Sequence, residues 1–222
     1  NNIDAIIMAT LNACEIYGMK NKGAIAPSYV ADIVVADDLN LSSISQVYKN
    51  GKLVCENGKA LFECETVDNS KVTNTVHLPK ISADFFKTDV KDKFDAIELI
   101  PESIITKKVT VSYSDSLSKV CVIERHHNLG TKGIGFVTNY GITNGAIASS
   151  IGHASHNVIV IGDNDSDMAL AVNTLGTSGG IAVCSEGKVI ASMTLDIAGL
   201  MSLKSADEVT REHDNLYSAA KV

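Results

Sequence analysis

Several common signals are absent from this 222-residue sequence, and each absence narrows what the protein can be. None of its five scattered cysteines has the CxxC spacing, which favours reduced thiols in a cytoplasmic protein over a disulfide framework or a zinc knuckle. No apolar run approaches the roughly 18 residues that a membrane-spanning helix needs. There is no block of Lys and Arg, and the net charge of -7 argues against nucleic acid or an anionic membrane as a partner.

Several catalytic motifs are missing as well. Zinc nucleobase deaminases of the cytidine type need H-x-E and P-C-x-x-C, and neither string occurs. The strings GxSxG and HExxH and the phosphate-binding P-loop are also absent. The composition, 45% apolar and 20% charged, is that of an ordinary globular protein with one large domain or two modest ones.

The first residues have the pattern of an amphipathic helix. The apolar residues at helical spacing are Ile3, Ile6, Ile7, Leu11 and Cys14. Gly18 or Gly23 can end this helix. Such a stripe needs a surface to pack against, and the segments that follow are only short strands. Either the helix caps its own domain or, as we expect, the chain is the C-terminal portion of a longer protein.

A compact β segment follows the helix. Four short stretches rich in β-branched residues are expected to be strands, at 31–37, 44–50, 52–57 and 59–64. Asn50-Gly51 and Asn57-Gly58 separate the last three, and Asn-Gly is a strong hairpin signal because both turn residues need positive φ. The pattern predicts a meander that is too small to be a complete domain. The polar stretch after it predicts a linker.

The second half of the chain has the strand and helix pattern of a larger α+β unit. Strands are expected at 109–114, 119–124, 134–139, 145–151, 157–162, 180–185 and 188–195. Because few helices separate these strands, most pairs must be antiparallel. Helices are expected at about 164–177 and from Ser205, where Glu208 completes a capping box. The sequence therefore predicts an antiparallel sheet packed with helices.

Three alternating aspartates precede and open the first of these helices: Asp163, Asp165 and Asp167. This is the spacing of a calcium loop, but the positions that should be glycine and glutamate are Met168 and Thr174. We therefore predict that Asp163 or Asn164 caps the helix and that the other acids favour its positive end.

Two polar clusters follow strand ends and are the best candidates for a functional surface. The first cluster contains Glu124, Arg125, His126, His127 and Asn128, and the second contains His153, Ser155, His156 and Asn157. Polar side chains at the ends of strands in one sheet can converge into a site. The other reading is a polar network that fixes loop geometry. The glycines at 130, 133 and 135 lead into a strand and not a helix, so they predict a flexible turn, not a phosphate site.

Residues 8–39, MATLNACEIYGMKNKGAIAPSYVADIVVADDL, resemble the point where an amidohydrolase-superfamily chain leaves the last helix of its (β/α)8 barrel and enters a β-sandwich. The usual pattern is A-T-x-N-x-A and then G-x-I-x-P-G-x-x-A-D-[IL]-V, and this chain has Ser28 where glycine is usual. Three more stretches resemble the C-terminal domain of the bacterial adenine deaminases. They are VIERHHNLGTKGIGFV (122–137), GAIASSIGHASHNVIVIGDNDSDMALAVN (145–173) and DIAGLMS (196–202).

The resemblance implies a domain division and an activity. Residues 1–22 would be the last barrel helix, 23–64 the C-terminal strands of the sandwich, 65–94 a linker and 95–222 the C-terminal α+β domain. The family hydrolyses adenine to hypoxanthine and ammonia, in purine salvage or catabolism, at a binuclear manganese or iron centre. A cytoplasmic homo-oligomer is expected. The family's barrel ligands begin with an H-x-H that this chain lacks, so we expect the isolated chain to bind no metal and to be inactive.

The resemblance leaves the two polar clusters as accessory residues. Glu124 to Asn128 and His153 to Asn157 could face the barrel's active site or a neighbouring subunit. Two other function classes stay open. One is a stand-alone α+β module that binds a purine or another small ligand. The other is a separate metallohydrolase site that uses His126, His127, His153 and His156.

Overall fold

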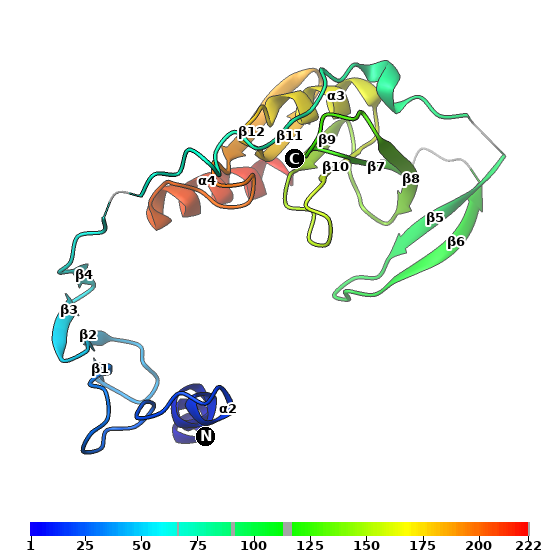
Figure 1. Cartoon of the computed structure of the whole chain (residues 1–222). Helices are drawn as coiled ribbons and strands as arrows, with labels where there is room; N and C mark the ends of the chain where they lie inside the picture. Colours follow the sequence, from blue (N-terminus) through cyan, green and yellow to red (C-terminus); the bar gives the residue numbers. More distant parts are fainter. Residues whose placement is uncertain (66, 90–91, 113–116, 222) are drawn as a thin grey trace. The chain divides into compact units, whose positions relative to one another are not determined.

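The computed structural model describes residues 1–65, 67–89, 92–112 and 117–221 (Figure 1). The chain divides into two compact units, residues 1–67 and 68–222. Together they give a mixed architecture of sheets with few helices, in agreement with the predicted α+β class. Within the described ranges, no helix has the length and apolar character needed to cross a membrane.

The first unit begins with the predicted helix. Its segments are α1 (Asn2–Ile7), a π-helical turn η1 (Met8–Asn12) and α2 (Ala13–Ile16). The Asn1 side chain caps the start, and Gly18, at φ 65°, follows the last turn. The predicted apolar stripe is only partly covered, because Ile3 remains 54% exposed and Ile7 40% exposed.

The predicted meander follows this helix. It consists of β1 (Ile33–Ala36), β2 (Ile44–Lys49), β3 (Lys52–Glu56) and β4 (Lys59–Ala60), paired antiparallel in chain order. Both Asn-Gly pairs have positive φ at each residue, as the hairpin prediction required. Ser28 also has φ 68°, a conformation that glycine adopts more readily, which explains the glycine usual at this place in the resembled pattern. No described residue of this unit is buried, so the unit has no core of its own.

The second unit is built on an eight-stranded sheet. Its strands are β5 (Lys93–Leu99), β6 (Thr106–Ser112), β7 (Ser118–Ile123), β8 (Lys132–Thr138), β9 (Gly145–Ser149), β10 (Val158–Gly162), β11 (Gly180–Ser185) and β12 (Lys188–Thr194). The order is β12-β11-β9-β10-β7-β8-β5-β6, and only the short β5–β8 pair among the described strands is parallel. The prediction of a mainly antiparallel sheet is confirmed.

Two helices cover opposite faces of this sheet, α3 (Asp165–Thr174) and α4 (Ala206–Ala219) (Figure 1). Alternate residues of β11 show the division, because Ala182 packs in the core with α3 while Val183 packs with Leu216 of α4. The capping box at Ser205 is present as predicted. Helix α3 ends earlier than the expected residue 177.

One strand was not expected, and one expected strand is shifted. β5 occupies residues that the sequence reading divided between linker and domain, because its charged positions hide the alternation of Phe94 and Ala96. Its neighbour β6 begins at Thr106, three residues before the expected start. The last two residues of that prediction, Tyr113 and Ser114, lie outside the described residues.

Most of segment 65–94, which the sequence analysis expects to be a linker, lies within the second unit. Val76, Ile81 and Phe86 are buried, and a short 3-10 helix, η2 (Ala83–Phe86), packs against α3. The Asn173 side chain also holds Ile81 through its backbone N–H and C=O, at 3.0 and 2.7 Å. The apolar residues of this segment follow no helical or strand period, so sequence patterning reads the segment as irregular and polar.

Candidate functional site

The two polar clusters are brought together by strand pairing. β7 and β10 are antiparallel neighbours, and Ile123 at the end of β7 is opposite Val158 at the start of β10. Residues 124–128 leave β7 at the same edge where residues 153–157 enter β10. The sheet register therefore places the two clusters side by side, although about 30 residues separate them in the chain.

Contacts between the clusters are made mainly through the backbone of the second. The Nε2 atom of His126 lies 3.1 Å from the Ser155 carbonyl oxygen. The rings of His126 and His127 have centroids 6.3 Å apart. Five exposed residues make up what we call the histidine face: His126, His127, His153, Ser155 and His156. Within the described residues, the side chains of His127 and His153 accept and donate no hydrogen bond.

Glu124 organises the first cluster. Its Oε1 atom accepts backbone N–H groups of His126 and His127 at 2.5 and 2.8 Å, and Oε2 accepts that of Leu129 at 3.1 Å. Desolvation acts to raise the pKa of the Glu124 carboxyl, but these backbone hydrogen bonds outweigh it and the net pKa is lowered. The carboxylate is therefore ionised, and both of its oxygens bind backbone N–H groups of the turn. This arrangement indicates a structural role for Glu124 and not that of a general base.

The second cluster is a tight turn that requires glycine at its start. His156 has φ 52°, and its N–H donates to the Gly152 carbonyl at 2.6 Å. A Cβ atom on Gly152 would lie 2.6 Å from the Asn157 carbonyl oxygen, so only glycine fits there. The buried Oδ1 atom of Asn157 has no hydrogen-bond partner in the described part of the chain.

Arg125 belongs to the first cluster but was given no role of its own by the sequence analysis, and it lies at the centre of this region. It is 2% exposed, and its Nε donates to the His156 carbonyl while Nη2 donates to the Ala198 carbonyl at 2.9 Å. Burial lowers the pKa of its guanidinium from the ordinary value. The available signal was a second charged residue, after Glu124, close behind the apolar run of β7.

The aspartates at α3 serve the fold. Asn164 caps the helix by accepting the Asp167 N–H at 2.8 Å, as predicted. Asp163 accepts backbone N–H groups at 144 and 145, Asp165 pairs with Lys119, and buried Asp167 accepts the Gly187 N–H. Across the described residues, no group of three or more His, Cys, Asp or Glu could hold a metal ion. The residues present therefore do not fit the metal centre that the family implies.

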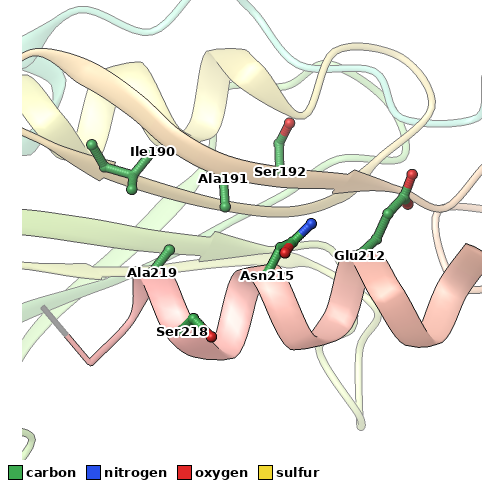
Figure 2. Close-up of a pocket in the computed structure, with 7 residues that line it drawn as sticks. All are labelled: Ile190, Ala191, Ser192, Glu212, Asn215, Ser218 and Ala219. Carbon is green, nitrogen blue, oxygen red and sulfur yellow. The ribbon is translucent and has the colours of Figure 1, made fainter.

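A surface cavity of about 480 Å³ lies between β12 and α4 (Figure 2). Ala191 of β12 and Asn215 of α4 project toward each other across it. Glu212 at its rim is paired through Oε1 with Lys204 at 2.5 Å. None of its lining residues belongs to the histidine face, and its walls are mostly small side chains, so it adds no reactive group to the candidate site.

Comparisons with known proteins find similarity in both units. Residues 98–222 match the adenine deaminase C-terminal domain, and residues 1–55 match the amidohydrolase family. An adenine deaminase of Clostridium acetobutylicum is 42% identical over 222 residues, covering 94% of this chain and 39% of the relative. Adenine deaminase 2 of Carboxydothermus hydrogenoformans is 40% identical, with 95% and 39% covered. An adenine deaminase of Nitratidesulfovibrio vulgaris is 36% identical, with 98% and 40% covered. The chain thus spans about two fifths of the length of these curated relatives.

Proposed function

The chain belongs to the family of the adenine deaminase C-terminal domain, and we propose that it works as the C-terminal portion of an enzyme that hydrolyses adenine to hypoxanthine and ammonia. The observation that carries this proposal is the extent of the similarity, which covers 94% or more of the chain and both of its units. A purine-metabolising, cytoplasmic homo-oligomer remains part of the proposal.

The first unit supports this proposal physically. It has no buried residue in its described part, although it exposes Ile3, Met8, Ile16 and other large apolar side chains. Each such side chain contributes roughly 1.5 to 3 kcal/mol when it is buried. In the proposal, residues 1–22 are the last barrel helix and residues 23–64 are sandwich strands of an amidohydrolase. The rest of that barrel and sandwich would cover these exposed side chains.

The catalytic metal, manganese or iron in the proposal, is not held by these residues. The sequence has no H-x-H, and the described residues offer no group of three ligands. No chemical step at a metal follows from this chain. Its contribution is the accessory one, in which the histidine face binds or orients groups near the adenine site. Glu124 would fix the first of the two turns that bear it.

Neither alternative is favoured by a specific observation. A separate metallohydrolase would need ligands that converge, and His126, His127, His153 and His156 form no such group in the described structure. A stand-alone purine-binding module would not account for similarity to an amidohydrolase over residues 1–55.

Ammonia release from adenine tests the proposal. The complete deaminase, reconstituted with manganese or iron, should turn over adenine, while the 222-residue chain under the same conditions should release none. Metal analysis of the purified chain should find less than stoichiometric metal. Ammonia release by the chain alone that is abolished by a His126→Ala or His153→Ala substitution would contradict the proposal and support a self-contained site.

A further inference from the structure

Two residues that are not glycine hold left-handed backbone on separate connections. His156, between β9 and β10, has φ 52°, and Ala198, after β12, has φ 55°. Such conformations are unfavourable for residues with a Cβ atom and persist only where surrounding contacts enforce them. Ala198 has no polar side chain that could compensate locally. Contacts from outside the turn must therefore hold Ala198 in this conformation.

The same guanidinium holds both turns. Arg125 donates from Nε to the carbonyl of His156 and from Nη2 to the carbonyl of Ala198, the latter at 2.9 Å. Gly199 packs so closely on the guanidinium that a Cβ atom there would overlap Nη1. Ser150 secures the second turn as well, because its Oγ donates to the Gly199 carbonyl at 2.5 Å. Arg125 thus binds the carbonyls of both His156 and Ala198.

The charge of Arg125 is not explained by an ion pair. Within the described residues no carboxylate lies at ion-pair distance from it, and burying a cation without a carboxylate is unfavourable. An apolar side chain of similar length would avoid the buried charge but would leave the carbonyls of His156 and Ala198 without this donor. The planar guanidinium instead offers several N–H donors in a fixed fork, which a lysine ammonium cannot reproduce.

We propose that Arg125 is a positioning residue that locks the 152–157 turn and the 196–201 turn into one arrangement, so that the histidine face meets the adenine site as a single rigid surface. This inference rests on the proposed function. It requires that loss of the guanidinium loosens both turns together and lowers deamination more than an equal loss of stability elsewhere does.

Amide hydrogen exchange on the 222-residue chain tests the lock without any need for activity. The N–H groups of His156 and Ala198 donate to Gly152 and Val72 at 2.6 Å, so both report on their turns. Arg125→Lys keeps the charge but should speed exchange at both amides by about tenfold or more, with the β10 and α3 amides little changed. Arg125→Ala should show the same effect and regain protection when methylguanidinium is added.

Val160→Ala is the matched control. Val160 is fully buried in β10, and its truncation lowers stability without touching either turn. It should speed exchange across the whole core, and methylguanidinium should restore nothing. Unchanged protection at either His156 or Ala198 in Arg125→Lys would overturn the lock. If Arg125→Ala does not fold, Arg125→Lys alone decides the result.

The complete deaminase supplies the functional half of the test. Arg125→Lys should reduce kcat/KM for adenine by about tenfold beyond the effect of Val160→Ala, and methylguanidinium should recover activity in Arg125→Ala. Equal losses in the lysine and Val160 variants would refute the positioning role while the proposed function stands. Absence of ammonia release by the unsubstituted enzyme would refute the proposed function, and with it the positioning role, while the exchange result would still decide the lock.

Discussion

Replacing Phe86 with alanine should destabilise the second unit strongly, because this residue belongs to the core and not to a linker. Phe86 is 0% exposed and packs in the same cluster as Met168 and Val172 of α3, with its ring edge-on to Phe85 at 5.4 Å between centroids. Truncation of a buried phenylalanine costs about 3–5 kcal/mol, from lost burial and the cavity that remains. That is a large share of the 5–15 kcal/mol typical of a whole domain, so the effect is easily measured.

Urea unfolding followed by far-UV circular dichroism measures this effect. Phe62→Ala is the control, because Phe62 is 57% exposed and the same chemical change there should alter the free energy of unfolding by less than about 0.5 kcal/mol. The Phe86→Ala transition of the second unit should move to clearly lower urea, with the slope unchanged. Equal midpoints for the two variants would show that residues 76–86 do not pack on the domain, as the linker reading required.

Three further predictions follow from local contacts. Limited digestion with a glutamate-specific protease should cut first at the exposed residues Glu63 or Glu65 and leave residues 68–94 attached to the core. Early cleavage at Glu98 would contradict this prediction. Hydrogen bonds from Lys22 and Lys49 lower the pKa of Asp32. The ionised carboxylate should therefore stabilise the first unit above about pH 3.8, and this stabilisation should be lost as the pH falls further. Asp32→Asn should abolish this pH dependence of the free energy of unfolding, measured in a pH titration. Gly152→Ala should lower the melting temperature because its Cβ meets the Asn157 carbonyl oxygen, whereas Gly133→Ala, with open space around it, should not.

Local chemistry predicted much of this fold. The Asn-Gly pairs gave the hairpin turns, the alternation of apolar residues gave most strands, and Ser205 with Glu208 gave the start of α4. Each of these signals depends on residues close together in the sequence. The packing of segment 76–86 was not predicted, because it depends on contacts with α3 about 90 residues away, which no local period reveals.

The candidate site was predictable only in part. Two polar clusters at strand ends could be recognised, but their meeting depends on β7 pairing with β10, and these strands are not consecutive. Glu124 is the lone carboxylate among the candidates, and its three backbone donors are visible only in the folded turn. Arg125 was overlooked for the same reason, because its partners at 156 and 198 are backbone carbonyls that carry no sequence signature.

The most direct test of the account is the rate of ammonia release from adenine by the complete, metal-reconstituted deaminase with the histidine face altered. A His126→Ala, His153→Ala double variant should lower kcat/KM by about tenfold or more. His213→Ala, an exposed histidine on α4 outside this face, should leave the rate unchanged. Equal rates for the double variant and the His213 control would contradict a role of this face in adenine deamination.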